Sequence, residues 1–205
     1  MNCVNCGAPM ELFERRRYYY CRHCGTFHFL QSAGIDGLEV LHRPDKAHSC
    51  AICSGGLAKA LLDTAYGVEY CQRCRGVLMS RATFAEIVRR RRAWASGAPV
   101  EPLPMDRLEL QRQIQCPACG GRMDAHPYYG PGNVVMDSCP VCDLIWLDCG
   151  ELDQIVAAPG RDRGTRDVPQ QSEVVASVLE PENDDSYSGR LKRVDLLEVL
   201  QQLLS

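Results

Sequence analysis

The sequence predicts a tandem array of small α+β modules rather than one large domain. The main observation is the arrangement of its 13 cysteines over 205 residues. All but one of them fall into Cys-x-x-Cys pairs, and consecutive pairs form three couples. The couples are Cys3, Cys6, Cys21 and Cys24, then Cys50, Cys53, Cys71 and Cys74, and then Cys116, Cys119, Cys139 and Cys142.

The spacing within each couple indicates a four-thiolate zinc site. The inner cysteines are separated by 14, 17 and 19 residues, and two Cys-x-x-Cys pairs at this separation are the sequence form of a zinc ribbon. Such short modules bury too little apolar surface to fold alone, so each needs the roughly 10–16 kcal/mol that a structural zinc ion supplies. We therefore expect three structural Zn²⁺ ions per chain, each held by the four cysteines of one module.

Two other uses of paired cysteines fit the sequence less well. A disulfide framework needs export, and the chain begins Met1-Asn2-Cys3 without the apolar stretch of a signal peptide. A thioredoxin-like redox pair needs a βαβ setting with a long apolar strand before the Cys-x-x-Cys, which the sequence lacks. Because no membrane-spanning stretch is present either, we expect the chain in the reducing cytoplasm, with no membrane partner.

The three modules repeat one apolar pattern around their cysteines, which marks them as related copies. Apolar side chains stand three and five residues after the fourth cysteine of each module, as expected for a strand with one face inward. They are Phe27 and Phe29, Val77 and Met79, and Ile145 and Leu147. A further apolar residue stands four positions after each second cysteine, at Met10, Leu57 and Met123.

The second module is expected to continue from its strand into a helix. Ser80 is a candidate N-cap for this helix. Apolar residues then lie on or near one helical stripe, at Phe84, Ile87, Val88 and Trp94. The first module lacks this pattern, and residues 33–41 predict a short extra strand instead.

The third module also predicts a trailing helix. Asp148 and Glu151 have capping-box spacing, with Asp148 as the cap, and Pro159-Gly160 ends the helix. The apolar face of the helix consists of Leu152, Ile155 and Val156. Before this module, residues 97–104 form a Pro-rich connector, and residues 106–114 predict a short helix capped by Asp106.

These signals divide the chain into six segments. The polar stretch after Pro159 predicts a flexible linker, and the last segment predicts an amphipathic helix with a broad apolar stripe. The segments are a first ribbon at 1–45, a second ribbon with a basic helix at 46–96, a linker with a short helix at 97–113, a third ribbon at 114–158, a flexible linker at 159–189, and a C-terminal helix at 190–205.

Three stretches of the third module carry a family resemblance. They are Cys116-Pro117-Ala118-Cys119-Gly120-Gly121, Cys139-Pro140-Val141-Cys142, and Trp146-Leu147-Asp148-x-Gly150-Glu151-Leu152. With these motifs the module resembles the TFIIB-type zinc-ribbon family, the transcription-factor zinc-finger domain. The second module resembles it more loosely, because it lacks the Trp and the Gly-Glu-Leu, and the first keeps only the cysteine pairs. The resemblance implies a zinc-binding β-ribbon with a trailing helix and little about activity.

Charge and basic clusters leave several interpretations open. The formal net charge is −3, and three loaded sites at −2 each make it about −9, which disfavours a general polyanion binder. Three interpretations fit the run of four arginines at Arg89, Arg90, Arg91 and Arg92. It contacts nucleic-acid phosphates, it is a solvated helix end, or its positive charge compensates the negative charge of the zinc sites. Residues 15–20, Arg-Arg-Arg-Tyr-Tyr-Tyr, form either a contact for single-stranded nucleic acid or, as we favour, a β-hairpin with a charged tip.

The other candidate residues are a cysteine, a tryptophan and three histidines. Cys149, at the start of the last helix, is either a reactive thiol or, as we favour, a small residue at a cap. Trp146 is expected to pack in the core, and its alternative is a surface contact. His42, His48 and His126 lie near modules whose sites already have four thiolates, so we expect them at the surface.

The sequence therefore predicts a non-enzymatic protein, because closed four-cysteine sites leave no open coordination position. The expected role is a zinc-binding adaptor or regulatory protein that mediates protein–protein contacts in transcription-linked assemblies. Its partner would bind the C-terminal stripe, from Val194 to Leu204. The equal alternative is that this stripe docks on a ribbon of the same chain. The alternative is direct nucleic-acid binding through residues 89–92 and the first ribbon, and a third possibility is a redox or zinc-sensing switch through Cys149 or a labile site.

Overall fold

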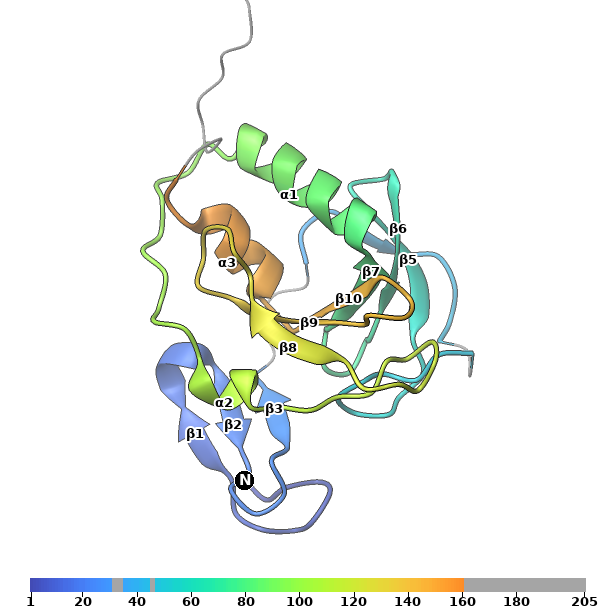
Figure 1. Ribbon diagram of the computed structural model, residues 1–205, viewed down its shortest axis with the longest axis vertical. Coiled ribbons are helices and arrows are strands. Elements are labelled where there is room, and N and C mark those ends of the chain that lie inside the picture. The colour runs from blue at the N-terminus through green and yellow to red at the C-terminus, as the bar shows by residue number, and fades with distance from the viewer. Residues whose placement is uncertain (31–34, 45–46, 161–205) are drawn as a thin grey trace, which may run out of the picture. The chain divides into compact units, whose positions relative to one another are not determined.

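Two antiparallel sheets and three α-helices make up the described part of the chain, residues 1–30, 35–44 and 47–160, in the computed structural model (Figure 1). The predicted class of small zinc-stabilised α+β ribbons is confirmed. The predicted C-terminal helix at 190–205 and all but the first two residues of the linker at 159–189 lie outside the described residues.

The first ribbon is a three-stranded sheet in the order β1-β2-β3. Its elements are β1 Glu11–Phe13, the 3-10 turn Glu14–Arg16, β2 Tyr18–Tyr20 and β3 Phe27–Phe29. The predicted hairpin with a charged tip is confirmed, and Arg17 closes the tip with a φ of 57°. Tyr18 is buried, and the centroids of its ring and the Phe27 ring lie 5.0 Å apart. Aromatic packing therefore supplies the small core of this ribbon.

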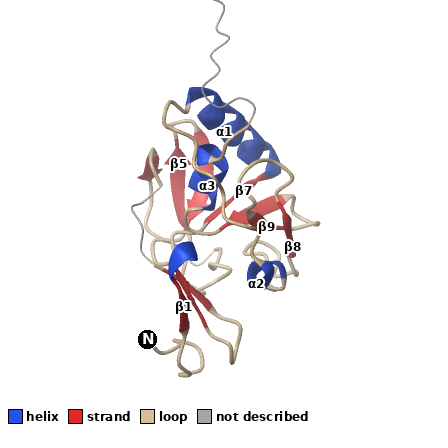
Figure 2. Cartoon of the chain, turned by 90° about the vertical axis from the view of Figure 1, so that its left-hand side faces the viewer, coloured by secondary structure: helices blue, strands red, loops and turns tan. Residues whose placement is uncertain are grey.

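The second and third ribbons share one seven-stranded sheet, in the order β4-β5-β6-β7-β10-β9-β8. Figure 2 shows part of this sheet, with β5, β7, β8 and β9 labelled. Its strands are β4 Leu38–Val40, β5 Ala58–Leu62, β6 Tyr66–Tyr70, β7 Val77–Ser80, β8 Asp124–Pro127, β9 Val135–Ser138 and β10 Leu144–Leu147. Strand β4 is the extra strand predicted after the first ribbon, and it pairs with β5 of the second. The two ribbons join where β7 pairs with β10, which we call the seam.

The seam joins equivalent strands of two repeats. Leu78 and Trp146 each stand four residues after the last zinc-site cysteine of their module, and they face each other across the seam. On either side, Val77 pairs with Leu147 and Met79 with Ile145. The pairing is therefore symmetric about the Leu78–Trp146 pair, as in a two-fold dimer built into one chain.

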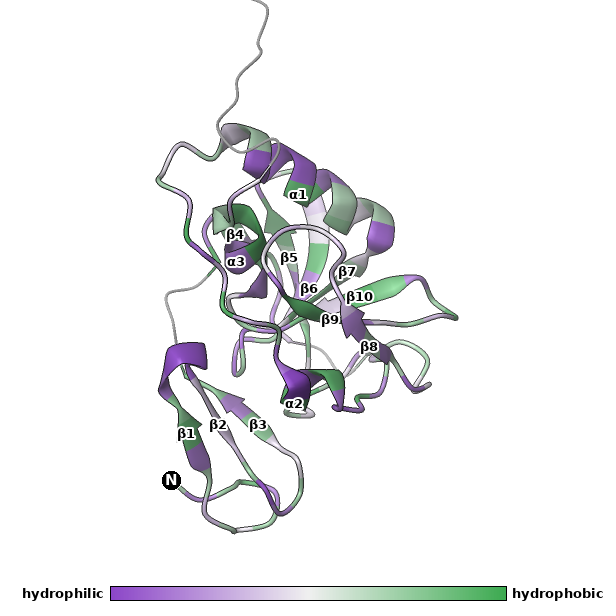
Figure 3. Ribbon diagram, turned by 60° about the vertical axis from the view of Figure 1, so that its left-hand side comes forward, coloured by the Kyte–Doolittle hydropathy of each residue, from purple (hydrophilic) through white to green (hydrophobic). Residues whose placement is uncertain are grey.

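Two helices, α1 Arg81–Trp94 and α3 Glu151–Ala157, pack on each other and help enclose the core of the shared sheet. Ser80 caps α1 as predicted, since its Oγ accepts a hydrogen bond from the Thr83 N–H at 3.1 Å. Apolar side chains of both helices, Phe84, Ile87, Val88, Leu152 and Ile155, join seam residues in one core cluster. Figure 3 shows polar and apolar residues alternating along α1, as an amphipathic helix requires.

Three expectations about helices need correction. Trp94 is 67% exposed and does not join the buried stripe of α1, because it lies in the last turn, beyond the core cluster. Only half of the capping box predicted for α3 forms. The Asp148 N–H donates to Glu151 Oε2 at 2.7 Å, but the N-cap is Gly150, and the Asp148 carboxylate accepts the Trp146 Nε1–H at 2.9 Å instead of capping the helix. The helix predicted at 106–114 is only α2, Arg107–Leu110, although Asp106 caps it by accepting the Leu108 N–H at 2.9 Å.

Candidate metal centres

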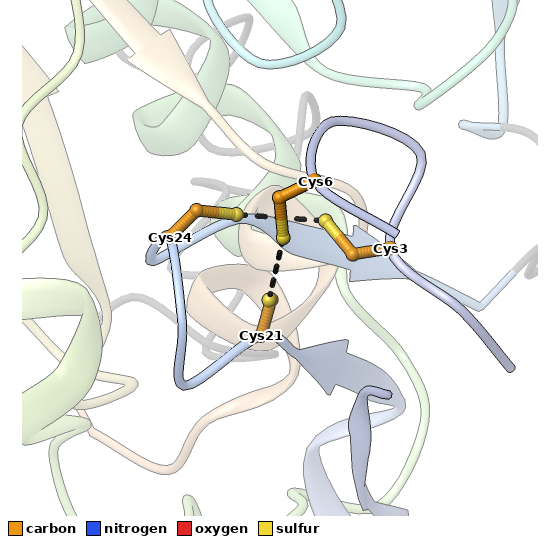
Figure 4. A group of neighbouring side chains, drawn as sticks. All are labelled: Cys3, Cys6, Cys21 and Cys24. Carbon is orange, nitrogen blue, oxygen red and sulfur yellow. Dashed lines mark hydrogen bonds between the residues drawn. The ribbon is translucent and has the colours of Figure 1, made fainter. Parts of the chain in front are cut away.

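The cysteine sulfurs converge in three groups of four, one in each ribbon. Within each group all sulfurs lie within 4.8 Å of one another. In the first, Cys3 Sγ lies 3.5 Å from Cys24 Sγ, and Cys6 Sγ lies 3.5 Å from Cys21 Sγ (Figure 4). A tetrahedral zinc ion with Zn–S bonds of about 2.3 Å places its sulfurs about 3.8 Å apart. The groups therefore have the size and the donor set of a four-thiolate zinc site.

The other two groups show the same spacing. The Cys50 and Cys74 sulfurs are 3.3 Å apart, and those of Cys119 and Cys139 are 3.7 Å apart. The first cysteine of every pair is buried, and the second is partly or fully exposed. Each site thus has one side in the ribbon and one side towards solvent.

A tight turn follows the second cysteine of every pair, and six such turns shape the three sites. The residue after that cysteine has a left-handed φ in all six, and these residues are Gly7, Gly25, Ser54, Arg75, Gly120 and Asp143. The turn aims backbone N–H groups at sulfur, as the Ile52 and Cys53 N–H do at Cys50 Sγ, both at 3.4 Å. Such donors stabilise the thiolate form that binds zinc.

The pKa values of two cysteines illustrate this stabilisation. Burial raises the pKa of Cys3, but hydrogen bonds from the Asn5 and Cys6 backbone outweigh it and lower the pKa to about 6. The pKa of Cys139 is lowered to about 7, because backbone donors at Cys142 and Val141 likewise outweigh burial. Hydrogen bonds thus favour a thiolate at these two positions, while the pKa values of Cys6 and Cys142 in the same sites are raised to about 12.

The remaining sequence candidates lie outside the cysteine groups. Cys149 is partly buried against the aromatic cluster of the first ribbon. His48 Nδ1 lies 2.8 Å from Glu69 Oε2, and His126 Nε2 lies 2.9 Å from Ser138 Oγ, while His42 is exposed. Trp146 is fully buried, as predicted.

The arginine run is not a continuous basic surface. Arg92 is only 4% exposed and donates hydrogen bonds to the Ile155 and Ala158 carbonyls at the end of α3. Arg91 pairs with Asp63 at 2.7 Å, and Arg89 pairs with Glu86 at 2.6 Å. Two of the four arginines therefore hold α1 against other elements.

Sequence reasoning missed a buried charge network centred on Arg112. The guanidinium, 5% exposed, lies between the carboxylates of Asp137 and Asp148, each 1% exposed. It also lies over the Phe27 ring of the first ribbon, 5.3 Å from the centroid. Burial raises the pKa of Asp137 to about 6, although Arg112 opposes the shift. No sequence signal marks Arg112, because it stands outside every cysteine pair and apolar stripe.

Comparison with known families assigns the third module. Residues 115–158 match the family model described as a transcription factor zinc-finger. The third module is a TFIIB-type zinc ribbon. This match and the three cysteine groups together support three structural zinc ions in the ribbon array. The searches of curated proteins and of solved structures found no match.

A helix that spans a membrane needs about 20 consecutive, mostly apolar residues. Among residues 1–30, 35–44 and 47–160, no helix has the length and apolar character needed to cross a bilayer.

Proposed function

We propose that this zinc-ribbon protein is a non-enzymatic adaptor or regulatory protein of the cytoplasm, whose ribbons carry protein–protein contacts in transcription-linked assemblies. The observation that carries the proposal is the closure of the three metal sites. Each group supplies four sulfurs, which fill the tetrahedral shell of zinc and leave no position for a substrate or a reactive water. The zinc ions then act only by stabilising the ribbons.

Exposed apolar side chains support a role in protein contacts. Val4 and Val141 each lie between the two cysteines of a Cys-x-x-Cys pair and are 73% and 80% exposed. Tyr129 is 90% exposed on the loop after β8. Aromatic residues of this kind are enriched in protein–protein interfaces. The C-terminal stripe from Val194 to Leu204, outside the described residues, is the second proposed contact.

Direct nucleic-acid binding is the alternative function. In its favour, Arg89 and Arg90 are exposed on α1, and Arg15 and Arg17 are exposed at the hairpin tip. Against it, Arg91 and Arg92 are engaged inside the protein. Of the three tyrosines that could stack on bases, Tyr18 is buried in the first ribbon, and Tyr19 and Tyr20 are partly buried. The net negative charge of the loaded protein opposes it further.

The two functions are separated by the effect of salt on binding. Anisotropy titrations with labelled 25-mer DNA and RNA at 50–300 mM NaCl should show only weak binding, and affinity for a protein partner should depend little on salt. Tight nucleic-acid binding that weakens steeply with salt, and that is lost when Arg15, Arg17, Arg89 and Arg90 become Ala, would replace the adaptor proposal.

The C-terminal contact is tested by substitution on its apolar stripe. Leu197→Asp and Leu200→Asp should abolish partner association while zinc content stays at three per chain. Gln201→Asp, which adds the same charge outside the stripe, is the matched control and should retain association. Loss of ribbon stability in the leucine variants would instead assign the segment to the protein's own core.

A further inference from the structure

A cavity of about 530 Å³ lies among the hairpin tip of the first ribbon, the Pro-rich connector and the start of α3. Its volume is within the range of small-ligand sites. Much of its wall is apolar and consists of Phe29, Leu30, Val100, Pro102, Leu103 and Val134. The wall therefore suits a hydrocarbon group rather than a strongly hydrated one.

Two buried acidic side chains line the same cavity. Glu151 is only 5% exposed, and its Oε2 accepts the Asp148 N–H at 2.7 Å. Its Oε1 is buried and has no hydrogen-bond partner among the described residues. Glu109, half-buried, lines the cavity as well. An unpartnered buried carboxylate oxygen is costly. Oε1 is closed to solvent as placed, so the carboxylate must turn towards the cavity for the N–H donor of a bound ligand to satisfy it.

The two arginines nearest the interior of this region, Arg112 and Arg16, are engaged with other groups. Arg112 contacts Asp137 and Asp148, and Arg16 contacts Asp106 at 3.2 Å and the Pro104 carbonyl at 2.6 Å. Neither guanidinium forms an ion pair with Glu151 or Glu109 in the described structure. The pKa of Glu109 is raised to about 8, mainly by burial and secondly by the Asp148 carboxylate. A raised pKa is what a carboxylate without a nearby free cation is expected to show.

We propose that this cavity binds an aliphatic cation, a primary ammonium or guanidinium group on an unbranched hydrocarbon stem. The head group lies beside Glu151 and Glu109, where its N–H donors satisfy Oε1 and its charge stabilises both carboxylates. The methylene stem packs on the apolar wall, as lysine and arginine stems do in proteins. Arg15 and Arg17 also line the cavity, but exposed Glu101 and Asp153 line it too, so these four exposed charges balance.

Two kinds of ligand could supply this cation. One is a free small amine or guanidine, and the other is a lysine or arginine side chain of a peptide. The test uses the zinc-loaded full chain and isothermal titration calorimetry. One arm compares n-butylguanidinium and n-butylammonium with n-butanol and butyrate. The other compares acetyl-Ala-Lys-Ala-amide with its norleucine counterpart. We expect binding of the cations of at least one arm and of none of the neutral or anionic analogues.

Substitutions then place the binding in this cavity. Glu151→Gln and Glu109→Gln should each weaken cation binding by about tenfold, the usual effect of losing one charged hydrogen-bond partner. Glu14→Gln, at an exposed acid of the hairpin tip that does not line the cavity, should leave affinity unchanged. Zinc content and the thermal midpoint of each variant report whether it is folded.

Three results would overturn the assignment. They are equal binding of butyrate and the cations, unchanged cation affinity in both glutamine variants, and no cation binding in either arm at millimolar concentration. Binding of the lysine peptide alone identifies a protein side chain as the source, and binding of the free cations identifies a small amine. The proposal does not depend on the adaptor role.

Discussion

Replacing Gly76 with alanine should disrupt the seam between the second and third ribbons. A Cβ at this position would lie 2.2 Å from Cζ2 of Trp146, 2.8 Å from Cε2 and 2.9 Å from Cη2. Gly76 does not have a left-handed φ, so its backbone accepts alanine, and the three atoms nearest the added Cβ all belong to the indole. Trp146 is fully buried, and its Nε1–H is held by Asp148, so the ring has no space into which to move.

The expected cost is about 3 kcal/mol of unfolding free energy, the upper part of the range for overpacked cores. Urea denaturation of the zinc-loaded protein at fixed free zinc, followed by far-ultraviolet circular dichroism, measures it. Gly67→Ala is the matched control in the neighbouring strand β6, because no heavy atom lies within 4 Å of its added Cβ. This control should change stability by no more than about 0.5 kcal/mol.

A double-mutant cycle assigns the cost to the Gly76–Trp146 contact. Leucine occupies the equivalent position in the second ribbon, at Leu78, so Trp146→Leu is the natural partner change. In that background Gly76→Ala should cost less by about 2 kcal/mol, since the conflicting ring is gone. An equal cost in both backgrounds, or a cost no larger than that of Gly67→Ala, would refute the reasoning.

Four further predictions concern the charge network and the metal. Arg112→Met should lower the free energy of unfolding by about 3–5 kcal/mol, because it leaves two buried carboxylates without their cation; exposed Arg122→Met is the control, and equal effects in urea melts would contradict this. The raised pKa of Glu109, about 8 against an ordinary 4.5, means that the folded chain keeps a proton that the unfolded chain releases between these pH values. The contribution of Glu109 to the free energy of unfolding therefore falls as pH rises through that window. The free energy of unfolding of Glu109→Gln should exceed that of wild type by about 2 kcal/mol at pH 8 but by little at pH 4.5. A difference that does not vary with pH would contradict this. Cys6→Ser should reduce bound zinc from three ions to two by metal analysis, while the seam core melts as in wild type. A chelator that removes all zinc should unfold every ribbon, and retention of native circular dichroism without metal would show that the zinc is not structural.

The shared sheet explains why only one of its two ribbons has a tryptophan in its seam strand. The second module lacks the tryptophan of the third, and by sequence alone this weakens its family resemblance. In the structure Leu78 and Trp146 form the centre of one seam, and the indole packs on Gly76. We infer that the large Trp146 on β10 and the glycine directly before β7 form a complementary pair.

The sequence by itself determined the features that arise from short-range geometry. A Cys-x-x-Cys turn brings two sulfurs together locally, so the twelve cysteines and their grouping were predictable from spacing. The same holds for the inward strand residues, the Ser80 cap and the hairpin of the first ribbon, because each depends on neighbours within a few residues.

Only the tertiary structure decided which modules join and which charges are buried. The seam pairs strands that are far apart in the chain, and no local pattern distinguishes its edge from the free edge of the first ribbon. Arg92 looked like part of a basic surface, but the carbonyls at the end of α3 lie 63 and 66 residues away and bury it. Arg112 gave no signal at all, since its partners Asp137 and Asp148 come from other elements. Burial depends on what the rest of the chain places around a side chain, and sequence neighbours do not contain that information.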